Sequence, residues 1–331
     1  MPQDIEKLAD ELLLKIRRRP GRAISLTYLG KLLKVEPDEL RSALTLLKEL
    51  GYKIRKQKNT VKFVAPADSL TDVEIGYQLK TKVIGRKTYA YRSVKSTNDI
   101  AAGMAQSGEP EGTIVTAEEQ TRGRGRLGRS WHSPPGCGIY VSIILRPKFK
   151  PELAPGLAVM TALALAETIS EVSKGETKIK WPNDILIGGR KAAGILTELS
   201  AEKNRVDYVV IGVGVNVNHK ADDFPPELSS IATSLRVANR RKVGRVDLLK
   251  RFLVNFEKEY RRYQKGQLSA SRKKIRSYSS LLGSHVRLRF GNRIVEGTAV
   301  DIDRTGALII EMDGKRRTIT SGEVTVVKDR G

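Results

Sequence analysis

The chain has 331 residues, of which 40% are hydrophobic and 29% charged, and its formal net charge is +23 at pH 7. This length exceeds one small core, so two or three domains are expected, and the charge favours contact with polyanions or anionic ligands. The positive charge has an alternative explanation, because lysines are spread over the whole chain, as they are in organisms whose proteins are generally basic. The single cysteine, Cys137, excludes an internal disulfide, and the acidic first ten residues do not resemble a signal peptide. We therefore expect a cytoplasmic protein.

The first region, residues 1–65, predicts a winged helix-turn-helix. Apolar residues recur at helical spacing from Ile5 to Ile16, and two further helix patterns follow, SLTYLGKLL and VEPDELRSALTLLKELG. The segment YKIRKQKNTVKFV then predicts a β-hairpin with a polar tip. This order of elements is typical of a DNA-binding domain. Residues 66–81 are expected to form a linker, partly helical.

The middle region, residues 82–272, mixes strand patterns with helices near 155–173 and 245–265. The strand patterns are TIVTAEE, GIYVSIIL, TKIKW and DYVVIGVGVNV. The apolar run LAPGLAVMTALALA is too short to cross a bilayer and contains Pro155, so we expect a buried helix and no membrane contact. The last region, residues 278–331, shows only short strand patterns separated by turn residues, which predicts a small β-barrel.

The loop TRGRGRLGRSW, residues 121–131, contains four arginines and three glycines. Its glycines satisfy G-x-G-x-x-G, but a dinucleotide site needs a helix to begin there, and the two prolines of the following SWHSPPG forbid one. No Walker sequence occurs in the chain. The loop is therefore either a flexible basic surface loop or a segment that closes over an anion, with arginines donating to phosphate oxygens.

Three further clusters contain polar residues near strand or helix ends. They are SVKSTNDIA with Ser96, Thr97 and Asn98, IKWPNDILIGGRKAAGILTEL with Asp184 and Lys191, and VIGVGVNVN with Asn216 and Asn218. Taken singly, each has an ordinary structural explanation: a helix cap, a turn acid, a solvated lysine. The three histidines lack ligand spacing, so no zinc site is expected.

Together and in this order, four segments resemble the biotin protein ligases. These segments are STN at 96–98, RGRGRLGRSW at 122–131, KWPNDILIGGRKAAGIL at 180–196 and GVGVNVN at 212–218. The resemblance implies an α+β multidomain protein with a class II synthetase-like mixed-sheet catalytic domain and an SH3-like C-terminal domain. The winged helix is similar to that of bifunctional members, which also repress transcription of biotin genes.

The resemblance implies a two-step reaction that needs biotin, ATP and Mg²⁺ and acts on a lysine of a biotin carboxyl carrier protein. Lys191, Arg126 and Arg124 are the implied catalytic residues, and Asp184 is the implied Mg²⁺ ligand. Biotin contacts are implied for Ser96, Thr97, Asn98, Gln120, Gly123, Arg124, Gly125, Arg126 and Lys191. ATP contacts are implied for Arg126, Arg129, Trp131 and Asn216. The loop is expected to stay open for substrates and to fold over the reactive intermediate.

Operator DNA is the second implied partner. Residues 1–65 carry 15 Lys and Arg against 8 Asp and Glu. The expected DNA contacts are Arg41, Ser42, Thr45, Lys56 and Lys58. The recognition helix nevertheless begins with Glu36, Asp38 and Glu39, which would face phosphates and disfavour strong generic binding.

Alternatives of other classes stay open at this point. One is a lipoate-type ligase, although its arginine-serine-polyglycine motif is absent, and another is a ligand-sensing transcription regulator without ligase activity. Repressing members of the family dimerise through the central sheet, so a homodimer is an additional expectation from the resemblance.

Overall fold

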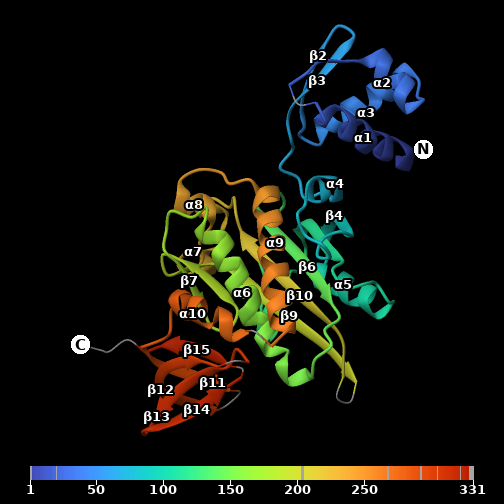
Figure 1. Cartoon of the computed structure of the whole chain (residues 1–331). Coiled ribbons are helices and arrows are strands. Elements are labelled where there is room, and N and C mark those ends of the chain that lie inside the picture. Colours follow the sequence, from blue (N-terminus) through green and yellow to red (C-terminus); the bar gives the residue numbers. More distant parts are fainter. Residues whose placement is uncertain are drawn as a thin grey trace. The chain divides into compact units, whose positions relative to one another are not determined.

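The computed structural model describes residues 2–19, 21–202, 205–266, 268–290, 293–303, 305–320 and 322–327. It divides into two units, Met1–Ser69 and Leu70–Gly331 (Figure 1). This division does not test the predicted domain boundaries, which stay predictions.

The N-terminal unit consists of helices and a small sheet in the predicted order. Its elements are α1 (Pro2–Arg17), β1 (Ile24–Ser25), α2 (Leu26–Leu33), α3 (Pro37–Glu49), β2 (Lys53–Gln57) and β3 (Thr60–Ala65), with the strands ordered β1-β3-β2. Pro37 occupies the first turn of α3, where its missing N–H is no cost. The Glu39 carboxylate accepts from Glu36 N at 2.9 Å and completes a capping box. Local sequence thus fixes where α3 begins.

The second unit is built on a seven-stranded mixed sheet ordered β4-β5-β6-β10-β9-β8-β7, in which only β4 and β5 are parallel. Its strands are β4 (Thr88–Val94), β5 (Ile114–Gln120), β6 (Gly138–Leu145), β7 (Thr177–Lys180), β8 (Asp184–Ile187), β9 (Arg190–Glu202) and β10 (Arg205–Asn216). The helices are α4 (Asp72–Gly76), α5 (Thr97–Gln106), α6 (Pro155–Ser170), α7 (Pro226–Ser229), α8 (Leu235–Asn239), α9 (Arg245–Gln264) and α10 (Leu268–Tyr278). Short 3-10 turns lie at Arg126–Gly128, Pro151–Leu153 and Ala221–Asp223.

Helices α6 and α9 cover one face of this sheet and form the main core with it (Figure 1). The helical stretch Pro151–Ser170 is longer than the apolar run suggested, and by length and composition it is the one described helical stretch able to cross a membrane. Yet 72% of its most apolar 18-residue segment is buried. The prediction of a buried helix here is confirmed.

The alternation along β10 explains why a pocket forms on the opposite face. Ile211, Val213 and Val215 belong to the core under α6 and α9. Strand geometry sends the intervening residues to the other face. There Val210 packs under α5, but Gly212 and Gly214 have no side chain. The sheet is therefore bare along this stretch, and other elements can approach its backbone.

The C-terminal strands form one antiparallel sheet ordered β14-β13-β12-β11-β15. They are β11 (His285–Phe290), β12 (Arg293–Ile302), β13 (Leu308–Met312), β14 (Lys315–Ile319) and β15 (Glu323–Val326). The prediction of short strands is confirmed, but a closed barrel is wrong for the described residues, because β14 and β15 lie at opposite edges. Sequence patterns predict where strands lie, but they do not predict whether the two edge strands pair to close the sheet. Trp181 Nε1 donates to Gly306 O at 2.8 Å and connects this sheet to the seven-stranded unit.

Candidate active site

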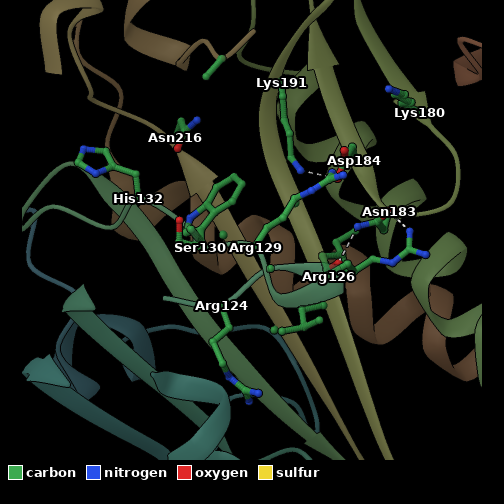
Figure 2. Close-up of a pocket in the computed structure, with 18 of the residues that line it drawn as sticks. Arg124, Arg126, Arg129, Ser130, His132, Lys180, Asn183, Asp184, Lys191 and Asn216 are labelled. Atoms are coloured by element: carbon green, nitrogen blue, oxygen red, sulfur yellow. Dashed lines mark hydrogen bonds and ion pairs between the residues drawn. The ribbon is translucent and has the colours of Figure 1, made fainter. Parts of the chain in front are cut away.

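A cavity of about 620 Å³ opens on the bare face of the central sheet. Its lining combines the start of α5, the loop at 121–131, strands β8, β9 and β10, and residues next to β15 in the C-terminal sheet. All four motif segments that carry the resemblance therefore meet at one place. Figure 2 shows the side chains of this pocket.

One end of the pocket is a buried polar network at the start of α5. Ser96, Thr97 and Asn98 are only 2–4% exposed. Gln120 Oε1 accepts from Thr97 N at 2.9 Å and from Thr97 Oγ1 at 3.1 Å. Ser142 Oγ donates to Thr97 Oγ1 at 2.8 Å and lies 2.5 Å from Asn98 Oδ1. Such a connected network holds each polar group in a fixed orientation. Ser96 occupies the N-cap position, although its side chain makes no capping hydrogen bond.

Asn98 lies directly on the glycine of β10. A Cβ added at Gly212 would lie 2.2 Å from Asn98 Oδ1, so no larger residue fits there without displacement. Asn98 Nδ2 donates to Glu198 at 2.8 Å. Glu198 also forms an ion pair with Arg124 at 2.9 Å, and Arg124 lies 2.6 Å from Asp99. Two carboxylates thus neutralise Arg124, which points away from Lys191 and Asp184 in Figure 2.

The arginine–glycine loop is folded as a short hairpin. Arg124 and Ser130 form a β-bridge, and Gly125 N donates to Arg129 O at 2.7 Å. Trp131 N donates to Gly123 O at 2.8 Å. A Cβ at Gly123 would lie 2.5 Å from Trp131 O, which explains a glycine at this position. The structure thus shows the loop in a folded conformation, and the open conformation expected for substrate entry stays a prediction.

Trp131 lies against two glycines of the sheet. A Cβ at Gly214 would be 2.4 Å from the indole Nε1, and one at Gly194 would be 3.2 Å from the ring. Lys191 Nζ lies 5.4 Å from the centre of the ring, within cation–π range. The indole N–H is buried against the sheet without a hydrogen-bond partner among the described residues.

Lys191 and Asp184 form an ion pair of 2.8 Å inside the pocket (Figure 2). Asp184 Oδ1 is buried and has no hydrogen bond of normal geometry within the described part of the chain. A single carboxylate suits a Mg²⁺ ion whose remaining ligands are phosphate oxygens and water. The described residues contain no cluster of three or more His, Cys, Asp or Glu able to hold a metal alone. Asp184 therefore fits a metal that arrives with a phosphate-bearing substrate.

Arg126 is held by two elements that lie far apart in the sequence. Its Nη1 donates to Asn183 Oδ1 at 2.7 Å, and its Nη2 donates to Gly322 O of the C-terminal sheet at 3.4 Å. Asn183 is itself fixed, because its Nδ2 donates to Ile195 O at 2.9 Å. Figure 2 shows Arg126 reaching toward Asn183. The position of this guanidinium thus depends on both the loop and the C-terminal sheet.

Asn216 and His132 line another side of the pocket. Asn216 Nδ2 donates to Thr233 O at 3.1 Å. His132 Nε2 lies 3.0 Å from Asp223 O. Behind it, His219 is fully buried, stacks on Phe224 and has no partner on either ring nitrogen among the described residues. Burial, assisted by His132, lowers the pKa of His219 to about 4.

Cys137 does not have the character of a nucleophile. Burial first, and the nearby Asp223 second, raise the pKa of its thiol above the ordinary value. A raised pKa leaves less thiolate at neutral pH.

Several residues that hold or line the site escaped prediction from sequence. Ser142 lies within an apolar strand and bonds to Thr97, Glu198 lies 100 residues from Asn98, and Gly322 precedes a strand of the C-terminal sheet. None of them carries a local signal. Lys180 and Asn183, which also line the pocket, lie inside the KWPND segment and could have been found there.

Two family models match the chain. The Biotin/lipoate A/B protein ligase family matches residues 89–216, and the Biotin protein ligase C terminal domain matches residues 281–327. The first range contains nearly all the motif residues that line the pocket.

Individual relatives agree with these matches. The bifunctional ligase/repressor BirA of Bacillus spizizenii is 39% identical over 84% of this chain and 86% of its own length. The biotin–acetyl-CoA-carboxylase ligase of Mycobacterium tuberculosis is 34% identical over 69% of this chain and 85% of its own. Among solved structures, the biotin protein ligase from Aquifex aeolicus in complex with biotin and ATP is 29% identical with a TM-score of 0.64. That match covers 74% of this chain and 100% of the other.

Proposed function

The chain belongs to the biotin protein ligase family and is a biotin–acetyl-CoA-carboxylase ligase, and from this premise we propose how its residues divide the reaction. In the first step, a biotin carboxylate oxygen attacks the α-phosphorus of ATP, giving biotinyl-5′-AMP and pyrophosphate. In the second, a lysine amine of the carrier attacks the biotinyl carbonyl, forming an amide and releasing AMP. The proposal rests on one observation: the polar network at α5 and the cations of the loop and β9 open into one pocket.

The biotin ureido ring binds at the buried network of Ser96, Thr97, Asn98 and Gln120. The ring offers both N–H donors and a carbonyl acceptor, and a fixed set of hydroxyl and amide groups can satisfy both. The low exposure of this end supports a neutral head group, because a charged one would pay a large desolvation cost there. The carboxylate end of biotin lies toward Arg124, Gly125 and Arg126, and Gly123 of the same loop contributes to the biotin site.

Arg126 and Lys191 stabilise the charge that develops at the α-phosphate. Phosphoryl transfer needs positioning and fixed positive charge more than covalent chemistry. The two hydrogen bonds that hold Arg126, and the contact of Lys191 with Asp184 and Trp131, support preorganised cations. Arg129 assists them, Trp131 packs beside the nucleotide, and Asn216 lies toward the adenine. Bound Mg²⁺ would neutralise phosphate charge, with Asp184 as its protein ligand.

A second role, repression of biotin genes, is supported by the order of elements in the N-terminal unit. Helices α1 to α3 followed by the β2–β3 hairpin match a winged helix-turn-helix. Arg41, Ser42 and Thr45 lie on α3, and Lys56 and Lys58 lie at the hairpin. DNA binding is expected to be weak in the monomer and promoted by biotinyl-AMP through dimerisation.

The function is tested with ATP, Mg²⁺, biotin and a biotin carboxyl carrier domain. The acceptor is expected to gain the mass of one biotinyl group, and an unchanged acceptor mass would overturn the assignment.

Arg126→Gly tests the role of the loop. We expect the variant to release biotinyl-AMP and to label lysines of bystander proteins, with a change in the free energy of unfolding below about 0.5 kcal/mol, because the loop is not core. Retention of the intermediate as in the wild type would assign closure to another residue.

A further inference from the structure

Among the described residues, the two most exposed large hydrophobic side chains both line the pocket. Leu127 is 71% exposed and Ile231 is 59% exposed. One belongs to the arginine–glycine loop, and the other lies between α7 and α8. A single exposed hydrophobic residue is ordinary at a protein surface. Leu127 and Ile231, however, are exposed and also line the same pocket, so they lie at its mouth. We call these two residues the rim pair.

Each member of the rim pair is tied to one of the two cations assigned to the phosphate. Leu127 directly follows Arg126. The Ile231 carbonyl accepts from Lys191 N at 2.8 Å, and Thr233 N donates to Lys191 O at 2.9 Å. The rim pair therefore flanks the approach to the space between Arg126 and Lys191.

The fold itself does not account for a leucine at position 127. Its backbone has φ 57 and ψ 36, in the left-handed region that disfavours residues with a branched side chain. Asparagine or glycine would adopt this conformation more easily. The side chain is also too exposed to contribute to a core. Neither turn geometry nor burial explains the residue, which leaves contact with a partner.

The ligase reaction requires one macromolecule to cover this mouth. Biotin and ATP enter the pocket, whereas the target lysine stays attached to a folded carrier, whose surface must approach as far as the reacting carbonyl. We propose that Leu127 and Ile231 form an apolar docking site for the carrier, contacting apolar side chains beside its target lysine. The net charge of +23 favours a carrier whose surrounding surface is acidic. This inference rests on the proposed two-step reaction.

The test compares a protein acceptor with a small one. Leu127→Asn and Ile231→Ser, alone and combined, remove the apolar contacts, and asparagine suits the left-handed backbone, so the loop keeps its fold. Pyrophosphate release without acceptor measures the first step. Transfer to a recombinant biotin carboxyl carrier domain, and to free hydroxylamine, measures the second. Ile294→Ser is the matched control, because Ile294 is 56% exposed and does not line the pocket.

We expect the double variant to raise the KM for the carrier domain about tenfold or more, as loss of a buried apolar contact would. Pyrophosphate release, transfer to hydroxylamine and the control should stay within about twofold of wild type. An unchanged KM for the carrier overturns the inference, as does a parallel loss of pyrophosphate release. A shift from dimer to monomer with unchanged carrier KM would assign the rim pair to self-association instead. If the wild type labels no carrier, the proposed function fails rather than this inference.

Discussion

The polar residues of the pocket and those of helix α3 find their partners in opposite ways. In the pocket, Arg126 contacts Asn183 and Gly322, and Asn98 contacts Glu198, in each case far along the sequence. On α3, Arg41 pairs with Asp38 three residues away, at 2.6 Å.

The same local pattern holds for the hydroxyl groups of α3. Ser42 Oγ and Thr45 Oγ1 donate to carbonyls four residues earlier, each at 3.0 Å. The acidic start of this helix is likewise used locally, because Glu39 caps the helix and Asp38 pairs with Arg41. Two of the three acids are therefore engaged within the helix, which reduces their conflict with DNA phosphates. The pocket is a product of tertiary structure, whereas the surface of α3 is set by its own helix and stays available to a partner.

The largest expected effect comes from a substitution in the pocket, where the side chains depend on tertiary contacts. Lys191→Ala should slow pyrophosphate release about a hundred- to thousand-fold, because loss of one preorganised charge costs about 3–4 kcal/mol. Biotin binding should fall only modestly. Lys178→Ala is a matched control, since Lys178 is similarly exposed and pairs with Glu176 two residues earlier. Stopped-flow pyrophosphate detection separates the two variants, and a near-wild-type rate for Lys191→Ala would remove its catalytic role.

The next prediction concerns the pH dependence of stability and the imidazole of His219. The tertiary structure buries this group without a hydrogen-bond partner among the described residues. Burial lowers the pKa of His219 from 6.5 to about 4. The unfolded chain therefore binds the proton more readily, and stability should fall as pH drops from 6.5 toward 4. The loss is at most about 3.5 kcal/mol, because each pKa unit corresponds to about 1.4 kcal/mol.

His219→Phe, which can still stack on Phe224, should flatten this pH dependence. Urea unfolding at pH 7 and pH 5 measures it, with the exposed His285→Gln as control. An equal pH dependence in His219→Phe and wild type would assign the titration elsewhere.

A smaller effect tests the close approach of α5 to the sheet. Gly212→Ala should lower the free energy of unfolding by about 1–3 kcal/mol, because its Cβ would overlap Asn98. It should also raise the KM for biotin about tenfold or more, since displaced hydrogen bonds cost about 1–3 kcal/mol. Gly103→Ala, within α5 and with open space at its Cβ, should instead stabilise by about 0.5–1 kcal/mol. Calorimetry and biotin titration check both, and equal behaviour of the two would contradict the contact.

The smallest effect is expected from a substitution on helix α3. Arg41→Ala should leave ligase activity and stability nearly unchanged, because an exposed pair at this spacing contributes about 0.2–0.5 kcal/mol. It should weaken DNA binding and reduce the slope of log K against log salt by about one. Asp38→Asn, which frees Arg41, should strengthen binding. Anisotropy titrations on DNA upstream of biotin genes, with biotin and ATP present, decide it, and a slope unaffected by either variant would remove Arg41 from the interface.

Local sequence was enough to define most of the elements and the family. Periodicity predicted α1 and α3, because a helix needs only neighbouring residues to define its apolar face. The continuous apolar run at 153–166 predicted α6. The four motif segments identified the ligase, and they contain most of the residues that line the pocket. Short strand patterns likewise predicted the strands of the C-terminal sheet, though not that its edges stay apart.

The partners that complete the site depend instead on the tertiary structure. Ser142, Glu198 and Gly322 are common residue types without a local pattern, and they matter because the strand order brings them to Thr97, Asn98 and Arg126. The face of β10 left bare by Gly212 and Gly214 becomes a pocket only when α5 and Trp131 close on it. Contacts between residues a hundred or more positions apart depend on strand order and on which face each side chain occupies. The local sequence determines neither of these, so the complete site forms only when the sheet is assembled.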